Sequence, residues 1–288
     1  MLTLTMASQS KILFTDIDDT LVTRKKELTR ENIEAINEAI GLGHKIVICT
    51  GRPITALQDF LEKLDMQKDG SYIITYNGGV IYDIFNKKVL LRNTLTKEKA
   101  QLLYDEAKKD NLYIQGYSVE DNLLIETYDD NADYYVRRLH IPYTVLDNYR
   151  ENLPDKVTKM MLVDINKPER LEKFRLEHLD WLNDWNIFYS SPYFLECVSK
   201  ETSKGNACVK LAEILDIPYE NTYAIGDSEN DLSMLESVCN PIAVNNATDQ
   251  CKSIAKYITE NDCDHSAVAE AIRNYILSTT HPLKGMGL

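Results

Sequence analysis

Short apolar runs alternate with amphipathic segments through the N-terminal part of the chain, and this alternation restricts the possible folds most strongly. The runs occupy residues 11–15, 46–50 and 72–75. Uninterrupted apolar runs of this kind are typical of strands that are buried on both faces. Between the first two runs, Ile33, Ile36 and Ile40 recur at helical spacing, and Thr29 is a candidate N-cap. Alternating strands and helices predict a parallel sheet that carries helices on both faces.

The pattern changes between about residues 83 and 188, where short strand-like runs and amphipathic helices replace the regular alternation. The alternation then resumes with a predicted helix and two predicted strands. These occupy residues 203–215, 222–225 and 241–244. We therefore expect a Rossmann-like, doubly wound α/β core built from residues 1–82 and 189–288, with an inserted α+β cap domain at 83–188. Active sites in such sheets lie at the carboxyl ends of the strands.

The charge of the chain restricts its partners. It has 45 acidic and 32 basic residues, which gives a net charge of −13. Since no run rich in Lys or Arg offsets this charge, we expect no nucleic acid partner and no binding to anionic membranes. An acidic protein can still bind a small phosphorylated molecule when a divalent cation neutralises the phosphate locally. No apolar run approaches the roughly 20 residues that a membrane span needs.

The cysteines and the N-terminal segment indicate a cellular compartment. The six cysteines are scattered and form no CxxC pair, which favours reduced thiols over a zinc site. Residues 1–10 lack the basic start and the long apolar stretch of a secretory signal. We therefore expect a cytoplasmic protein. We also expect a monomer or a weak homo-oligomer.

Two clusters of carboxylates follow predicted strands. Asp16 and Asp18 occupy alternate positions directly after the first apolar run, where both can face one pocket. Asp227 and Asp231 follow the predicted strand at 222–225 and open a helix. Hard oxygen ligands of this type suit Mg²⁺, and paired carboxylates suit a nucleophile and a proton donor. Solvated acidic turns and helix caps are the alternative interpretation.

Two further segments offer groups that could bind an anion. Thr50, Gly51 and Arg52 follow a predicted strand and supply a hydroxyl, free backbone N–H groups and a guanidinium. A capping Thr and a solvated Arg are the alternative there. Lys204 lies at the start of a predicted helix, where the helix dipole favours an anion over a cation. An ordinary surface lysine is the alternative for that residue.

Taken together, these motifs resemble those of the haloacid dehalogenase superfamily, and in particular its Cof-type hydrolases with a large α/β cap. The four family motifs are similar, in order, to residues 16–20, Thr50, Lys204 and residues 226–231. Residues 76–79 and 245–247 also resemble that subfamily. The similarity extends over nearly the whole chain, from Lys11 to about Ile272.

The resemblance implies a Mg²⁺-dependent phosphatase that acts on small phosphorylated metabolites, with sugar phosphates favoured. Asp16 would form an aspartyl phosphate, while Asp18 would protonate the leaving group and later deprotonate the attacking water. The implied catalytic residues are Asp16, Asp18, Thr50 and Lys204. The implied metal-binding residues are Asp16, Asp18, Asp227 and Asp231. The implied substrate-binding residues are Thr50, Gly51, Arg52, Asn77, Lys204 and Asn230.

Two other functions fit the same motifs. A phosphomutase would use the same aspartyl phosphate but return the phosphoryl group to a sugar. A non-catalytic metabolite-binding protein could keep the fold, although the presence of Asp16, Asp18, Lys204 and Asp227 favours an enzyme.

Two segments depart from the family pattern. Asp19 stands where the family usually has glycine, but aspartate tolerates turn conformations better than most residues. Residues 263–267 replace a turn that contains glycine in relatives, which leaves the shape of this loop open. His265, within this loop, is expected at the surface.

Overall fold

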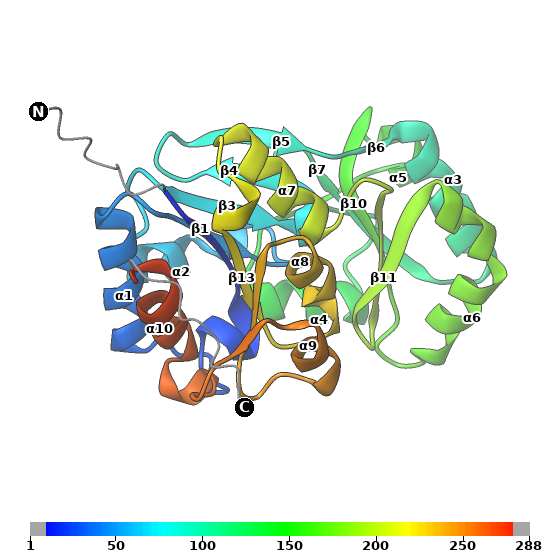
Figure 1. The fold of residues 1–288 in the computed structure, drawn as a ribbon. Helices are drawn as coiled ribbons and strands as arrows, with labels where there is room; N and C mark the ends of the chain where they lie inside the picture. The colour runs from blue at the N-terminus through cyan, green and yellow to red at the C-terminus, as the bar shows by residue number, and fades with distance from the viewer. Residues whose placement is uncertain (1–9, 279–288) are drawn as a thin grey trace, which may run out of the picture.

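The computed structural model describes residues 10–278, which form two β-sheets, at the left and right of Figure 1. The expectation that residues 1–10 are not a secretory signal concerns residues that, apart from Ser10, lie outside the described range. The larger sheet has eight strands in the order β15 (Tyr257–Ile258), β14 (Asn240–Ala243), β13 (Thr222–Gly226), β1 (Ile12–Asp16), β2 (Lys45–Cys49), β3 (Ser71–Thr75), β4 (Val80–Asp83) and β5 (Lys88–Arg92). Its strands from β15 to β3 are parallel, while β4 and β5 pair antiparallel at one edge. The predicted doubly wound core is confirmed.

Helices cover both faces of this sheet because its crossovers run in two directions. The chain passes from β1 through α1 to β2, and from β13 through α8 to β14 on the other side of β1. Since such crossovers are right-handed, α1 and α8 lie on opposite faces. In Figure 1, α1, α2 and α10 lie to the left of the strands and α7, α8 and α9 to the right. The helix bounds are α1 Arg30–Gly41, α2 Gln58–Lys63, α7 Lys204–Ile214, α8 Leu232–Glu236, α9 Asp249–Ile254 and α10 Ala267–Ala271.

Capping residues fix the starts of two of these helices. The Thr29 hydroxyl accepts a hydrogen bond from the Asn32 N–H at 3.3 Å, which confirms the predicted N-cap of α1. The Ser203 hydroxyl accepts one from the Asn206 N–H at 3.0 Å and begins α7. Helix α7 therefore starts at Lys204, where the sequence predicted a helix start.

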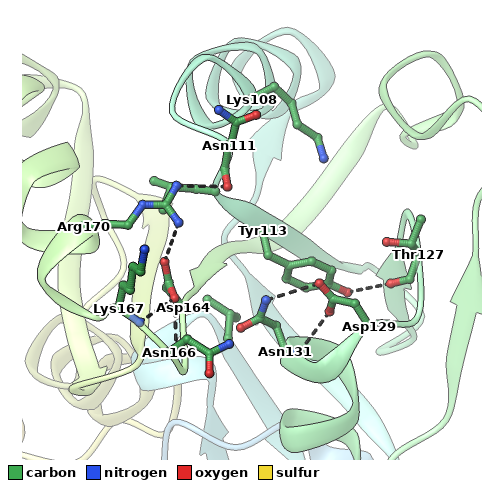
Figure 2. A pocket seen from close by; sticks show the side chains of 12 residues that line it. Lys108, Asn111, Tyr113, Thr127, Asp129, Asn131, Asp164, Asn166, Lys167 and Arg170 are labelled. Atoms are coloured by element: carbon green, nitrogen blue, oxygen red, sulfur yellow. Dashed lines mark hydrogen bonds and ion pairs between the residues drawn. The ribbon is translucent and has the colours of Figure 1, made fainter.

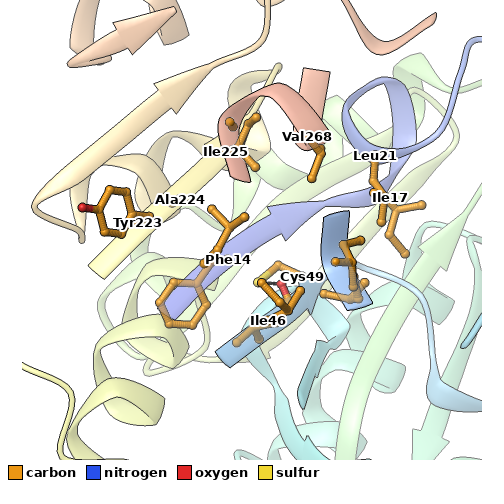
Figure 3. Packing of buried hydrophobic residues seen from close by; sticks show 14 of the residues in the cluster. Phe14, Ile17, Leu21, Ile46, Cys49, Tyr223, Ala224, Ile225 and Val268 are labelled. Carbon is orange, nitrogen blue, oxygen red and sulfur yellow. Dashed lines mark hydrogen bonds between the residues drawn. The ribbon is translucent and has the colours of Figure 1, made fainter. Parts of the chain in front are cut away.

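The core of the larger sheet centres on strand β1, which is buried along its whole length. Figure 3 shows Phe14 and Leu21 packed among Ile46, Ile225 and Val268, which come from three other parts of the chain. Each aliphatic or aromatic side chain of this size contributes roughly 1.5–3 kcal/mol when it is fully buried. This packing fixes the strands, and with them the loops at their carboxyl ends.

The second sheet is mostly antiparallel. Its strands run in the order β11 (Trp185–Ser191), β12 (Phe194–Ser199), β10 (Lys156–Val163), β7 (Tyr113–Ser118), β8 (Leu123–Ile125) and β9 (Tyr143–Val145), and β6 (Leu95–Thr96) pairs with β10. Its helices are α3 (Lys97–Lys109), α4 (Asp130–Leu139), α5 (Tyr149–Asn152) and α6 (Glu169–Glu177). Leu103 of α3 and Phe174 of α6 belong to one hydrophobic cluster, and Tyr135 of α4 belongs to another. Residues of β10 alternate between the two clusters, which shows that the clusters lie on opposite faces of the sheet.

The change from one sheet to the other differs from the predicted boundaries at 83 and 188. Strand β5 (Lys88–Arg92) still pairs with the larger sheet, so residue 83 marks the turn of an edge hairpin. Strand β12 (Phe194–Ser199) pairs with β10 in the second sheet, although it lies within residues 189–288, which were predicted to belong to the core. Local sequence could not separate these cases because pairing partners are distant in the chain.

None of the helices within residues 10–278 is long and apolar enough to cross a membrane. The six cysteines all lie in this range and are free thiols, as their scattered spacing predicted. Five of them are buried.

Candidate active site

Four loops meet at the carboxyl edge of the larger sheet. Asp16 ends β1, Thr50 follows β2, Asn77 follows β3, and Asp227 follows β13. These strands are neighbours in the sheet, and the register pairs Asp16 with Cys49 and Thr15 with Ile225. Residues that are far apart in the chain therefore converge at one edge, as the sequence predicted for this fold.

Lys204 is the central cation of this edge. Its Nζ donates to Asp16 Oδ1 and to Asp231 Oδ1, each at 2.6 Å. The side chain is only 1% exposed, and these two carboxylates raise its pKa above the ordinary value. A buried ammonium needs such partners because removal from water is costly. The interpretation of Lys204 as an ordinary surface lysine is therefore wrong.

Two glycines allow the backbone to approach both sides of this lysine closely. Gly78 has a φ of +103°, and a Cβ at this position would lie 2.0 Å from the Ser203 carbonyl oxygen. A Cβ on Gly205 would lie 2.2 Å from the Ser233 carbonyl oxygen. Larger residues at either position would push α7 away from its neighbours, and with it Lys204.

Asp231 is fully buried and holds the turn that carries Asp227. Its Oδ2 accepts hydrogen bonds from the Asp227 N–H at 3.1 Å and the Ser228 N–H at 3.4 Å. The carboxylate thus links the turn after β13 to Lys204. Asp227 Oδ1 in turn accepts a hydrogen bond from the Thr20 hydroxyl at 2.8 Å. This contact of Thr20 was not foreseen, although Thr20 belongs to the first motif.

The carboxylates of Asp16, Asp227 and Asp231 form a group that could hold a metal ion, with one oxygen from each within 4.8 Å of the others. Lys204 supplies a single positive charge to this group. Burial and repulsion by Asp231 raise the pKa of Asp16 to about 8 and that of Asp227 to about 6. Among the described residues, none donates a hydrogen bond to Asp16 Oδ2 or Asp227 Oδ2. A divalent cation fits this group because it would neutralise the remaining charge and bind those oxygens.

Asp18 lies at the outer side of this edge, where its side chain is 41% exposed. Arg52 Nη2 donates to both of its carboxylate oxygens, at 2.8 and 2.9 Å. Lys26 Nζ lies 3.3 Å from Asp18 Oδ1. Arg52, predicted to bind substrate, is thus paired with Asp18 in this structure. Lys26 was not foreseen, because lysines are common in exposed loops and nothing in its local sequence distinguishes it.

The two departures from the family pattern adopt the backbone conformations that glycine would favour. Asp19 has a φ of 62° and Ser266 a φ of 65°. Both therefore lie in the left-handed region, which Asp tolerates better than most residues. The expectation for Asp19 is confirmed, and the loop at 263–267 keeps a turn without glycine. His265 has a side chain that is 74% exposed, as expected.

The remaining predicted substrate residues lie in different surroundings. Thr50 is buried, and its hydroxyl oxygen accepts a hydrogen bond from the Arg52 N–H at 3.2 Å. Gly51 leaves room for Asn77, since a Cβ there would lie 2.8 Å from Asn77 Nδ2. Asn230 is exposed, and its Oδ1 accepts a hydrogen bond from the Ser228 hydroxyl at 2.6 Å. The structure thus brings Thr50, Gly51 and Asn77 together, while Asn230 stays outside the buried group.

A separate polar hollow of about 420 Å³ is lined by residues from the strands, helices and loops of the second sheet (Figure 2). Its polar side chains largely bind one another: Arg170 Nη1 donates to Asp164 Oδ2 at 2.9 Å, and Asn131 Nδ2 donates to Asp129 Oδ2 at 3.2 Å. Its lining includes none of the residues from the four loops. The hollow is therefore distinct from the candidate active site.

The fold and the site together define a class of protein: an α/β enzyme whose buried carboxylates and lysine converge at the carboxyl edge of one parallel sheet. The sequence model described as haloacid dehalogenase-like hydrolase matches residues 13–272, and the chain belongs to this family. The predicted family resemblance is confirmed.

Known proteins resemble the chain along almost its entire length. A protein of Streptococcus pyogenes serotype M6, provisionally named a phosphatase, is 33% identical over 282 residues, covering 93% of this chain and 99% of that protein. The Bacillus subtilis 5-amino-6-(5-phospho-D-ribitylamino)uracil phosphatase YcsE is 29% identical over 267 residues, covering 93% and 96%. The crystal structure of a haloacid dehalogenase-like hydrolase from Bacteroides thetaiotaomicron has a TM-score of 0.82 at 29% identity, covering 92% of this chain and 99% of that chain.

Proposed function

We propose that this protein is a Mg²⁺-dependent phosphatase that hydrolyses small phosphorylated metabolites through an aspartyl phosphate on Asp16. The observation that carries the proposal is the buried Asp16 carboxylate, which has one oxygen bound by Lys204 and the other without a donor among the described residues. Such a carboxylate is held in place and has an oxygen available for attack. The phosphatase names of two similar proteins support this reaction class.

In the first step, Asp16 Oδ2 attacks phosphorus in line with the leaving oxygen, and the P–O bond to the organic group breaks. Lys204 and the Thr50 hydroxyl donate hydrogen bonds to the phosphoryl oxygens, where negative charge is concentrated. The Thr50 oxygen accepts from the Arg52 N–H, so its own proton is free to donate. Asp18 supplies the proton that the departing alkoxide needs.

In the second step, a water molecule attacks the phosphorus of the aspartyl phosphate, and the bond to Asp16 breaks. Asp18, now ionised, accepts a proton from this water. Inorganic phosphate leaves and the Asp16 carboxylate is restored. Arg52 orients Asp18 through its hydrogen bonds to both carboxylate oxygens.

Asp16, the backbone carbonyl of Asp18 and Asp227 are the groups that would hold Mg²⁺. The role of Asp231 would be to position the Asp227 turn and Lys204, to both of which it is hydrogen-bonded, and not to bind the metal directly. Bound Mg²⁺ would offset the charge that builds up on the phosphoryl group. The second sheet is proposed as a cap that covers this site and contacts the organic part of the substrate.

Hydrolysis of phosphate monoesters is expected to require a divalent cation. Protein stripped of metal and assayed in excess EDTA should release about 100-fold less phosphate from a panel of metabolites than protein supplied with Mg²⁺. Phosphate release measured by a colorimetric assay tests this expectation. Full activity in EDTA would contradict the metal requirement, and conversion of hexose phosphates without phosphate release would indicate a phosphomutase.

Mg²⁺ should also stabilise the folded protein through Asp227. A ligand that binds only the folded state at 100 times its Kd adds about 2.7 kcal/mol of stability, so the melting temperature should rise with Mg²⁺ concentration. Asp227→Asn should remove most of this rise, since it loses one carboxylate charge from the group. Glu229→Gln, in the same turn but exposed, is the matched control and should keep the rise. An Asp227→Asn variant with the wild-type response to Mg²⁺ would exclude Asp227 as a ligand.

A further inference from the structure

A fully buried ion pair lies in the second sheet. Lys159 Nζ is 3.0 Å from Glu196 Oε1, and the two side chains are 1% and 3% exposed. Lys159 lies opposite Tyr117, and both Glu196 and Gln115 lie opposite Met161, so these side chains share one face of the sheet. Burying two charges in a sheet that is otherwise largely apolar costs free energy, which apolar residues of the same size would avoid. Stability alone therefore does not explain the pair.

The face that carries this ion pair is the face that contacts the candidate active site. Asn77 Nδ2 donates to Glu196 Oε2 at 3.5 Å, and Asn77 lies in the loop after β3 at the carboxyl edge of the larger sheet. Lys159 Nζ lies 5.5 Å from the ring centre of Tyr76, in the same loop, and 5.4 Å from that of Tyr117. The pair thus lies directly across from the loops that surround Asp16.

The chemistry of the pair selects among possible leaving groups. A strong hydrogen-bond donor and a strong acceptor lie side by side, with no net charge between them. An apolar leaving group would form no hydrogen bond with either group, so the two would keep only the partners that the protein supplies. A second anionic group would be attracted by Lys159 and repelled by Glu196, so the neutral pair would give it no net electrostatic gain. Neighbouring hydroxyl groups fit, because one can donate to Glu196 while the next accepts from Lys159.

The surroundings of the pair are consistent with such a ligand. The aromatic rings of Tyr76 and Tyr117 flank Lys159, and both rings are buried. On the same face, both amide atoms of the buried Gln115 lack a hydrogen-bond partner among the described residues. The protein alone therefore does not satisfy all the polar groups of this face.

We propose that Lys159 and Glu196 are specificity-determining residues that bind the hydroxyl groups of a polyhydroxylated leaving group. This inference rests on the proposed phosphatase function and names the class of its substrate: sugar or polyol monophosphates without a second anionic group. The two residues bind the organic part of the ester and take no part in phosphoryl transfer.

The test compares esters with and without hydroxyl groups. The full chain with Mg²⁺ is assayed on glucose 6-phosphate, ribose 5-phosphate, sorbitol 6-phosphate and p-nitrophenyl phosphate. The double variant Lys159→Met/Glu196→Leu removes both charges together and so leaves no unpaired charge. Its kcat/KM for the best hydroxylated ester should fall about 100-fold, since hydrogen bonds to bound hydroxyls are lost. Its kcat/KM for p-nitrophenyl phosphate should stay within about threefold, because that leaving group has no hydroxyl to bind.

A matched control uses the same substitutions at another ion pair of the second sheet and its helices. Lys108 pairs with Glu126, away from the Asn77 loop. Lys108→Met/Glu126→Leu should change neither activity more than about threefold. If circular dichroism shows that the Lys159/Glu196 double variant is unfolded, the single variant Glu196→Gln decides. It should raise the KM for the hydroxylated ester about tenfold and leave the KM for p-nitrophenyl phosphate unchanged.

Several outcomes would overturn the inference. Equal losses for both kinds of ester in a folded variant, or no loss for either, would show that the pair is structural. A wild-type protein that hydrolyses p-nitrophenyl phosphate but none of the hydroxylated esters would also overturn it, while leaving the phosphatase function intact. Hydrolysis of none of the four esters would contradict the phosphatase function itself.

Discussion

Replacing Asp16 with Asn is expected to lower kcat by about 10⁴-fold or more, because the amide is a poor nucleophile and cannot form the acyl phosphate. Asn is nearly the same size as Asp, so the packing at the end of β1 should be retained. Phosphate release from the preferred metabolite and from p-nitrophenyl phosphate should fall together. Turnover within about tenfold of wild type would show that the phosphoryl group is not transferred to Asp16.

The pH dependence of stability shows whether the Asp16→Asn variant loses activity through its chemistry or through unfolding. Burial and repulsion by Asp231 raise the pKa of Asp16 from its ordinary 3.8 to about 8 in the metal-free protein. The folded state then keeps a proton that the unfolded state releases, so the stability contributed by this group falls as the pH rises through that window. The Asn variant has no such proton. In EDTA, its melting temperature should therefore depend less on pH and should be no lower than that of wild type at pH 8.

A second substitution, Asp19→Asn, serves as the matched control for Asp16→Asn. Asp19 lies in the same loop, with a side chain that is 44% exposed and paired with Lys26. Asn tolerates its φ of 62° as well as Asp does. Activity should stay within about threefold of wild type, since surface ion pairs contribute little.

Replacing Asp18 with Ala is expected to slow the first chemical step only for substrates with a poor leaving group, and to slow the second step for all substrates. A sugar alkoxide is a poor leaving group and needs a proton from Asp18, whereas p-nitrophenolate departs readily without one. Hydrolysis of the aspartyl phosphate needs Asp18 as a base for either substrate. The variant should therefore lose steady-state turnover on both, by roughly 10²–10⁴-fold. On p-nitrophenyl phosphate it should release a burst that approaches one product per active site.

Rapid-quench measurements test this expectation, since the burst should coincide with phosphate bound covalently to the enzyme. The absence of both burst and labelled enzyme would contradict the dual role of Asp18. Asp18→Asn is the matched control because its amide oxygen can still accept a hydrogen bond from Arg52. If the loss arises only from release of Arg52, the Asn variant should recover activity. If proton transfer matters, it should behave like the Ala variant.

Much of the core and of the candidate site could be predicted from the sequence, because the signals are local. Uninterrupted apolar runs indicated the buried strands, and the polar residues directly after them had to lie at one edge of a parallel sheet. Asp16, Thr50 and Asp227 each follow such a strand, and the structure brings them together. The family pattern, in which glycine usually stands at the position of Asp19, likewise indicated a turn conformation there.

Tertiary structure alone decided the features that depend on pairing between distant segments. The limits of the two sheets were among them, because the local sequence of β5 or β12 does not show which sheet the strand pairs with. The partner of Arg52 was another, since a guanidinium after a strand can face an anion or a carboxylate such as Asp18. The burial of Lys204 and of the Lys159–Glu196 pair depends on three-dimensional packing in the same way. Sequence determines which groups are available at each strand end, whereas the free energy of burying a charge depends on which groups the fold places beside it.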